Sequence, residues 1–234
     1  MASKQDFLNN IAKKLGRTRV LEVTKPAWGP HPGEHMFQGL SQKELTSLFE
    51  QEMIKLGGEV IRVPSLNQLA TAIHSWLRQS KVNRVVSWDV DTPVGREVKK
   101  ALLAFQPALN LTFWDEQEDR EKLITAAEKA DAGFTFAEYG LAESGSIILY
   151  NRGNAGRLVS LLPNISANVL LAKDIVPRLT QSLAHLADKA WEYSCINIVT
   201  GPSRSADIEM DLSIGVHGPG HLLVFLVEEY GEEE

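Results

Sequence analysis

A glycine-rich stretch, Gly201–Gly220, contains the residues whose types and spacing are best suited to binding a small anion. It reads GPSRSADIEMDLSIGVHGPG and lies between two apolar runs, Ile196–Val199 and Leu222–Val227. Glycines leave backbone N–H groups accessible, and convergent N–H groups form concavities that bind anions. We therefore expect one anionic ligand to be contacted by Gly201, Ser203, Arg204, Asp207, His217 and Gly218, and a rigid, packed turn without a ligand is the alternative.

The first half of this stretch predicts a helix N-terminus directly after a strand. Ser203 or Ser205 would cap a short helix that begins near Ala206 and ends at Gly215. Such a terminus binds anions through its free N–H groups and the helix dipole, and Arg204 would add a forked, charged contact. An alternation of apolar and polar residues from Ile208 to Ile214 is also typical of a strand, but the flanking caps favour the helix.

His217 lies among glycines and a proline, on a turn with little conformational freedom. It is a candidate proton carrier or ligand contact, and a purely structural hydrogen-bonding role is equally compatible with the sequence. We therefore name it as a candidate catalytic residue without a fixed role.

A second loop, Ala137–Ser146, combines a carboxylate with a small hydroxyl-rich turn. Ser144, Gly145 and Ser146 offer hydroxyl groups and free backbone amides for a ligand. Glu143 beside them is a candidate acid, base or nucleophile. An ordinary β-turn with a solvated glutamate explains the same residues, so both interpretations stay open.

The chain lacks the sequence motifs of several common nucleotide-binding and catalytic sites. The sequence contains no phosphate-binding P-loop, no G-x-G-x-x-G, no H-E-x-x-H and no G-x-S-x-G. His31 and His35 lie in a Pro/Gly-rich segment without fixed geometry, so no metal site is predicted. Cys195 is the only cysteine, which excludes an internal disulfide and a self-contained iron–sulfur cluster with four thiolate ligands. It begins an apolar strand, where a buried and inert thiol is expected.

Strands alternate with helices along most of the chain, which indicates a parallel sheet covered by helices. We expect an N-terminal helix and Pro/Gly-rich arm over residues 1–40, and one α/β domain over residues 41–234. About seven strands should form one mostly parallel sheet. The predicted strands are Glu59–Val63, Arg84–Trp88, Leu109–Trp114, Ser146–Tyr150, Asn168–Leu171, Cys195–Thr200 and Leu222–Val227. The predicted helices are 3–16, 41–57, 65–79, 93–105, 118–130 and one capped by Asp174.

Composition narrows the class of protein. Apolar residues make up 44% of the 234 residues and the formal net charge is −6, as in an ordinary globular protein. A nucleic-acid partner is not expected, because such binding depends on clustered Lys and Arg. No run of 18 apolar residues and no signal-peptide pattern is present, so we expect no membrane span and a cytoplasmic location.

Taken together, the motifs resemble those of the lactate-utilisation domain family. The matching segments are Glu143–Ser146, Leu161–Pro163, Gly201–Ile208 and Gly215–Pro219, and the N-terminal Phe7–Gly16 fits the full-length pattern. The pair GPSRSADI and GVHGP in this order is specific, whereas ESGS alone is not. The family often has threonine where this chain has Ser144, Ser146 or Ser205, and the exchange keeps the hydroxyl.

The resemblance implies a three-layer α/β/α fold like that of glucosamine-phosphate isomerase, ribose-phosphate isomerase and CoA transferase. It also implies a role in oxidising L-lactate to pyruvate, as a non-redox subunit whose partner proteins carry the iron–sulfur clusters. No catalytic residue is transferred from the family. Two alternatives stay open: an enzyme of the CoA-transferase or isomerase kind that uses Glu143, and a structural scaffold that docks redox partners through the N-terminal arm and helix 41–57.

Overall fold

The structure, a computed structural model, describes residues 3–19, 33, 36–105, 108–186, 189–206, 211 and 213–229. The chain divides into two compact units, residues 1–38 and 39–234, and each is described by itself. The predicted arm around His31 and His35 lies outside the described residues. None of the described helices is both long enough and apolar enough to cross a membrane.

Unit 1 contains one helix, α1 (Lys4–Lys14), which has a well-formed N-terminus. Ser3 and Asp6 form a capping box, in which each side chain bonds the other residue's backbone N–H. After the helix the chain doubles back, and the Arg19 guanidinium donates to the side chains of Gln5 and Asn9. Three apolar residues lie on the other side of the helix and are exposed. Phe7, Ile11 and Leu15 are 62%, 39% and 61% exposed.

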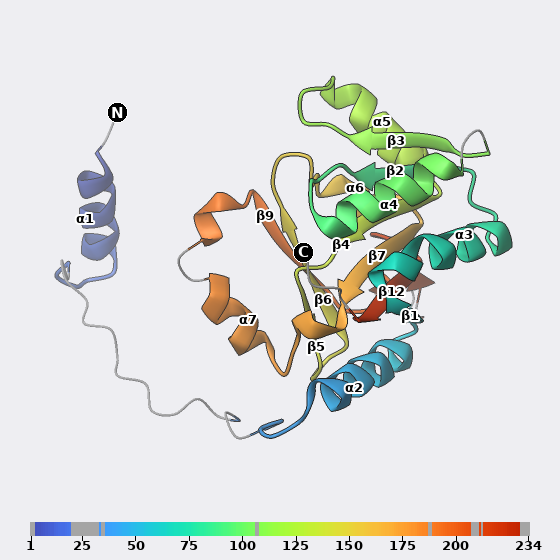
Figure 1. The fold of residues 1–234 in the computed structure, drawn as a ribbon. Helices are drawn as coiled ribbons and strands as arrows, with labels where there is room; N and C mark the ends of the chain where they lie inside the picture. Colours follow the sequence, from blue (N-terminus) through green and yellow to red (C-terminus); the bar gives the residue numbers. More distant parts are fainter. Residues whose placement is uncertain are drawn as a thin grey trace. The chain divides into compact units, whose positions relative to one another are not determined.

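Unit 2 is built on a six-stranded, fully parallel sheet with the order β1-β12-β7-β4-β2-β3 (Figure 1). Its strands are β1 (Glu59–Ser65), β2 (Arg84–Trp88), β3 (Asn110–Trp114), β4 (Ala132–Phe136), β7 (Ile165–Leu171) and β12 (His221–Glu229). The inner strands read as nearly continuous apolar runs, as expected when both faces of a parallel sheet are covered. β4 was not predicted, because its AGFTF run has only two large apolar residues, Phe134 and Phe136.

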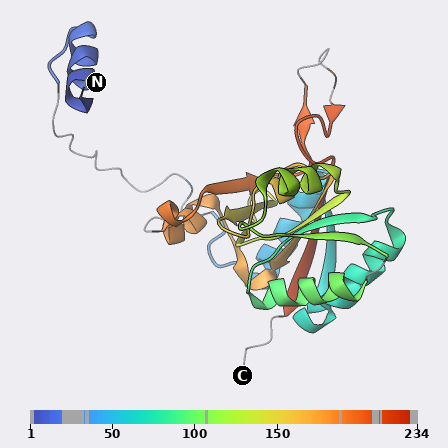
Figure 2. The ribbon, with the colours of Figure 1, turned by 90° about the horizontal axis from the view of Figure 1, so that it is seen from above.

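Helices cover both faces of this sheet, which confirms the predicted three-layer α/β/α class (Figure 2). α3 (Leu69–Gln79) and α4 (Pro93–Ala104) lie on one face, and α5 (Arg120–Lys129) and the short α6 (Leu158–Leu161) lie on the other. α2 (Gln42–Lys55) packs against β1 and the neighbouring segment β8 (Ile175–Val176). The remaining helical segments are α7 (Leu179–Leu186) and the 3-10 turns η1 (Leu66–Gln68), η2 (Ala172–Asp174) and η3 (Ala190–Glu192).

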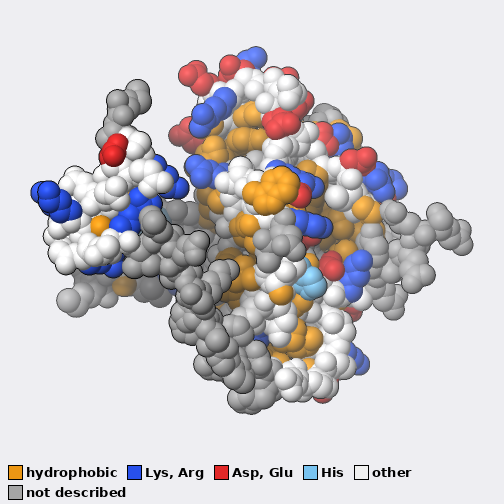
Figure 3. All heavy atoms as spheres, turned by 90° about the vertical axis from the view of Figure 1, so that its left-hand side faces the viewer, with side chains coloured by type: hydrophobic (Ala, Val, Ile, Leu, Met, Phe, Trp, Pro, Cys, Tyr) orange, Lys and Arg blue, Asp and Glu red, His pale blue; other side chains and the backbone are white. Residues whose placement is uncertain are grey.

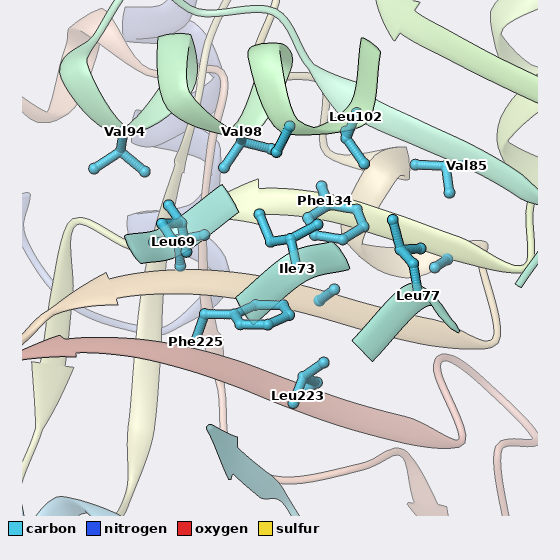
Figure 4. Close-up of a cluster of buried hydrophobic side chains, with 14 of the residues drawn as sticks. Leu69, Ile73, Leu77, Val85, Val94, Val98, Leu102, Phe134, Leu223 and Phe225 are labelled. Atoms are coloured by element: carbon cyan, nitrogen blue, oxygen red, sulfur yellow. The ribbon is translucent and has the colours of Figure 1, made fainter. Parts of the chain in front are cut away.

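The main core lies between the sheet and the α3–α4 layer (Figure 4). Phe134 of β4 and Phe225 of β12 stack with ring centroids 6.2 Å apart, and both are fully buried. The Trp76 ring of α3 meets both rings edge-on, at 5.9 and 6.1 Å. Offset and edge-to-face aromatic contacts add to the stabilisation from burial, so this cluster anchors helix and sheet to each other.

A second sheet of four short strands has the order β8-β5-β6-β9, with β5 (Tyr139–Leu141), β6 (Ser146–Asn151) and β9 (Cys195–Val199). The prediction that Ser146–Tyr150 and Cys195–Thr200 belong to the main sheet is therefore wrong. β6 pairs antiparallel with β5 and with β9, whereas every pair in the main sheet is parallel. An apolar run alone does not show which sheet a strand joins.

Capping hydrogen bonds explain why some helix starts were predicted correctly and others were not. The capping box of Ser41 and Glu44 is present at α2, and Thr92 caps α4 with Pro93 in the first turn. Ser65 makes no side-chain cap bond, because it ends β1 and is followed by η1. The predicted cap at Asp174 is wrong, since that residue lies in η2 and α7 begins only at Leu179.

Candidate ligand-binding loops

Two of the predicted loops meet at the C-terminal end of α2. At Gly145 an added Cβ would lie 2.3 Å from the Met53 backbone nitrogen, and at Gly201 it would lie 3.2 Å from the Leu56 carbonyl oxygen. Both glycines have positive φ, +58° and +78°. The α2 backbone therefore requires glycine at position 145, while at position 201 the positive φ and a tight approach to Leu56 favour it, and both are packing reasons independent of any ligand.

A chain of hydroxyl groups links the two loops. The Ser146 Oγ lies 2.8 Å from the Ser144 Oγ and 2.7 Å from the Thr200 Oγ1. Ser146 is buried and Ser144 is half-buried. These hydroxyls satisfy one another across the β6–β9 pair, and the sequence analysis overlooked Thr200 as their third member.

Arg204 lies at the same helix end, where it donates from Nη2 to the Leu56 carbonyl oxygen. The last carbonyls of a helix are unsatisfied and carry partial negative charge. Arg204 therefore caps α2, and the site around Ser144, Gly145 and Gly201 faces the helix end that repels anions.

Glu143 is held at the start of α7. Its Oε2 accepts from the Arg178 Nε at 2.8 Å, and its Oε1 accepts from the Leu179 backbone N–H at 3.0 Å. Leu179 is the first residue of α7, so the Glu143 carboxylate supplies the N-terminal cap that was predicted for Asp174. Both carboxylate oxygens are engaged in contacts that fix the loop to the helix.

We expect Glu143→Ala to lower the free energy of unfolding by about 1–2 kcal/mol, because it removes the cap and the ion pair together. Glu143→Gln keeps an acceptor for the Leu179 N–H and should lower it by less than about 1 kcal/mol. Urea unfolding followed by circular dichroism measures both changes. Equal losses in the two variants would contradict the capping role.

Four aromatic rings gather around α7, at positions that the sequence analysis did not single out. Tyr139 stacks on His185 with centroids 5.8 Å apart, and Tyr150 contacts Tyr193 at 4.5 Å. Burial raises the pKa of the Tyr150 phenol to about 12, with smaller contributions from nearby Tyr139 and Glu138. The Tyr150 hydroxyl is therefore protonated and neutral at physiological pH.

The stretch Gly201–Gly220 lies at the amino edge of the main sheet, because it leads from β9 of the second sheet into the start of β12. Its described part includes a two-stranded antiparallel pair, β10 (Arg204–Ser205) with β11 (Ser213–Ile214). The prediction of a helix ending at Gly215 is wrong for Ser213 and Ile214, which form β11, while most of the alternating residues between Ile208 and Ile214 lie outside the described part. Residues 207–210 lie outside the described part, so Asp207 is not placed.

Backbone hydrogen bonds close the base of this pair. The Ser203 N–H donates to the Pro219 carbonyl, and the Gly215 N–H donates to the Ser203 carbonyl, both at 2.9 Å. His217 is exposed at the turn between them, and Gly218 is half-buried. The predicted ligand residues thus fall into two groups, one around α2 and one at this turn.

A hollow of about 620 Å³ opens beside the turn. Gly215 and Gly218 line it, together with cationic residues from the ends of β2 and α5. Its polar and glycine lining includes Lys81, Arg84, Lys129, Asn164, Gly215 and Gly218. The sequence analysis missed the first four, because nothing local in the sequence shows that these loops meet at one edge of the sheet.

Asp131 fixes the amino ends of β2 and β4 beside this hollow. Its Oδ2 accepts from the backbone N–H groups of Asn83 and Arg84 at 2.9 and 2.8 Å, and Arg84 also pairs with it. Burial alone would raise the pKa of the Asp131 carboxyl, but these hydrogen bonds outweigh burial and lower it.

A lowered carboxyl pKa stabilises the fold above the ordinary value of 3.8, and this stabilisation is lost as the pH falls through the folded-state pKa. We therefore expect Asp131→Asn to be less stable than the native chain at pH 7, with a difference that shrinks below pH 3.8. Thermal unfolding of both chains over a pH series measures it. A difference that stays constant with pH would contradict the charge-based role.

The surface carries both signs of charge. Figure 3 shows acidic and basic side chains interspersed over the visible face of unit 2, while Lys and Arg predominate over acidic side chains on unit 1. Within α1, Lys13 and Lys14 occupy the last turn, where they complement the helix dipole. The visible face of unit 2 therefore presents mixed charge rather than a stripe of one sign.

Comparison with known proteins identifies the family of this parallel-sheet α/β protein. The model of the LUD domain matches residues 46–227, which is most of the chain. The chain belongs to the LUD domain family. Every loop described above lies within or next to the matched region, whereas α1 lies outside it.

Relatives match along nearly the whole chain. Lactate utilization protein C of Halalkalibacterium halodurans is 35% identical over 97% of this chain and 98% of its own length. The protein of that name from Bacillus subtilis is 35% identical over 97% of each chain, and that of Anoxybacillus flavithermus is 36% identical over 91% and 94%. A solved DUF162 family protein from Deinococcus radiodurans shares the fold, with a TM-score of 0.59 and 23% identity over 80% of this chain and 99% of its own.

Proposed function

We propose that this protein takes part in the utilisation of L-lactate, in the pathway step that oxidises L-lactate to pyruvate. The observation that carries the proposal is similarity along nearly the full chain to several proteins named lactate utilization protein C, at about 35% identity. Coverage of 97% of both chains supports transfer of the role of a whole protein rather than of one shared module.

We further propose that the chain is a non-redox subunit and that partner proteins with iron–sulfur clusters accept the electrons. Oxidation of lactate to pyruvate releases two electrons and two protons, which require an acceptor. Four thiolates usually hold an iron–sulfur cluster, and Cys195 is the only cysteine of this chain. A cytoplasmic location fits such partners, because that compartment keeps thiols and Cys195 reduced.

Growth tests this function directly. Deleting the gene for this chain should abolish growth on L-lactate as sole carbon source and leave growth on pyruvate unchanged, because only the oxidation step is lost. Expression of the chain from a plasmid should restore growth. Undiminished growth of the deletion strain on L-lactate would contradict the proposal.

A second role, docking of a partner protein, is favoured by the exposed stripe Phe7, Ile11 and Leu15 on α1. Apolar side chains at i, i+4 and i+8 are the anchors of a helix that lies in a partner's groove. The family domain does not include α1, yet an alignment over 97% of 234 residues leaves only about seven residues outside, so the relatives share most of unit 1.

Deleting residues 1–36 distinguishes the two roles. A scaffold should lose its partner in a pull-down and lose growth on lactate, while unit 2 keeps its thermal midpoint. A triple serine variant of Phe7, Ile11 and Leu15 is the sharper form of the test, since it leaves the α1 capping box in place. Full partner capture by both variants would eliminate the docking role.

A further inference from the structure

We propose that the hollow at the amino edge of the main sheet binds a phosphate-bearing organic ligand of nucleotide size. This site is separate from the proposed role in lactate utilisation and does not depend on it. It is formed where the loops before β2, β4, β7 and β12 come together, next to the turn that carries the GVHGP motif.

The charge of the lining favours an anion. Lys81, Arg84 and Lys129 contribute three positive charges, against the carboxylates of Glu128 and Asp131. The Asp131 carboxylate is already compensated by two backbone N–H groups and by Arg84. Within the described part of the chain, Lys81 and Lys129 have no ion-pair partner, so they are available to a ligand.

The size of the hollow favours a ligand larger than lactate. Its volume is about 620 Å³, and a second hollow of about 730 Å³ shares Arg84, Lys129 and Ala130 with it. Pockets of roughly 300–1,000 Å³ accommodate drug-sized molecules and cofactors. The two hollows are neighbours at these shared residues, and the second adds Asp119, Glu121 and Lys122 to the lining.

The edge strand β3 gives the second hollow a polar wall. Asn110 and Thr112 line the second hollow together with Thr125 of α5, whereas Leu111 and Phe113 pack on the core of the opposite face. A parallel strand that is covered on both faces is normally apolar throughout. The polar positions on the α5 side therefore fit hydroxyl and amide groups of a ligand whose phosphate lies near Lys81, Arg84 and Lys129.

The glycine turn can closely approach such a phosphate. Gly215 has a φ of +80°, and a Cβ at Gly218 would meet only the Ser203 side chain, at 3.5 Å and beyond. At Gly220 there is less space, since an added Cβ would lie 2.9 Å from the Asn164 Oδ1. The turn is thus held against the start of β7, and Gly215 and Gly218 line the hollow, with the Gly215 N–H already donated to the Ser203 carbonyl.

Calorimetric titration and thermal unfolding of the full chain test the site with coenzyme A, NAD, ATP, inorganic phosphate and L-lactate as probes. At least one of the three phosphate esters should bind and raise the midpoint, whereas L-lactate should not. A double variant, Lys81→Ala with Lys129→Ala, should weaken that binding at least tenfold, and higher salt should weaken it further. Both lysines are exposed and unpaired, so this variant is expected to fold.

Lys43→Ala is the matched control, because Lys43 is an exposed lysine of α2 that lines neither hollow. It should bind the probe like the native chain. The proposal is overturned if none of the phosphate esters binds, or if the double variant binds as tightly as the control. Neither result affects growth on lactate, so failure of this site and failure of the proposed function are distinguishable.

Discussion

Gly145→Ala should destabilise the protein by about 3 kcal/mol or more, because two effects act at once. A residue other than glycine is strained at a φ of +58°, and its Cβ would lie 2.3 Å from the Met53 nitrogen and 2.7 Å from the Glu52 carbonyl carbon. Both atoms belong to the backbone of α2, which cannot move aside as a side chain does. For a chain of this size, the thermal midpoint should fall by roughly 6–12 °C.

Gly153→Ala is the control for backbone strain alone. Gly153 also has positive φ, +49°, but its nearest neighbour would be the Glu116 side chain at 3.5 Å. We expect a loss of about 1 kcal/mol there. If Gly145→Ala and Gly153→Ala lose the same stability, the close approach of α2 is not the reason for glycine in the ESGS turn, and a ligand-based reason regains weight.

Phe225→Ala should lower the free energy of unfolding by about 3–5 kcal/mol, through loss of burial and the cavity left behind. The Phe225 ring is fully buried, stacks on Phe134 and receives the edge of Trp76. Chemical denaturation of the purified variant measures the change, provided that enough folded protein is obtained.

Leu103→Ala provides the comparison, since Leu103 lies on α4 but is 45% exposed. That change should cost less than about 1 kcal/mol, because little apolar surface returns to water. A loss below about 1.5 kcal/mol for Phe225→Ala would mean that the α3–α4 layer is not the principal core.

Local signals in the sequence predicted most helices and strands of the main sheet. Ser41 and Glu44 marked the start of α2, and Pro93 marked the start of α4, because caps and prolines act over three or four residues. The order of strands could not be predicted in this way. β6 and β9 have apolar runs like those of the main sheet, and only their tertiary pairing assigns them to a second sheet.

In the candidate site, too, local features could be predicted from the sequence, whereas contacts between distant segments could not. Composition drew attention to the glycine turn that ends in Gly218, and in the structure Gly215 and Gly218 line a hollow. It could not show that the α2 backbone requires glycine at position 145, or that Glu143 caps a helix 36 residues further along the chain. Those constraints come from segments distant in sequence, as do Lys81 and Lys129, which have no local signal for binding.

The most direct test of the central claim is oxidation of L-lactate by the partner proteins, purified from the deletion strain, with and without this chain. The rate of pyruvate formation with an artificial electron acceptor is measured. We expect pyruvate to form only when the chain is added, while the iron–sulfur absorption of the proposed partners is the same in both samples. Equal rates with and without the chain would contradict a role in lactate oxidation.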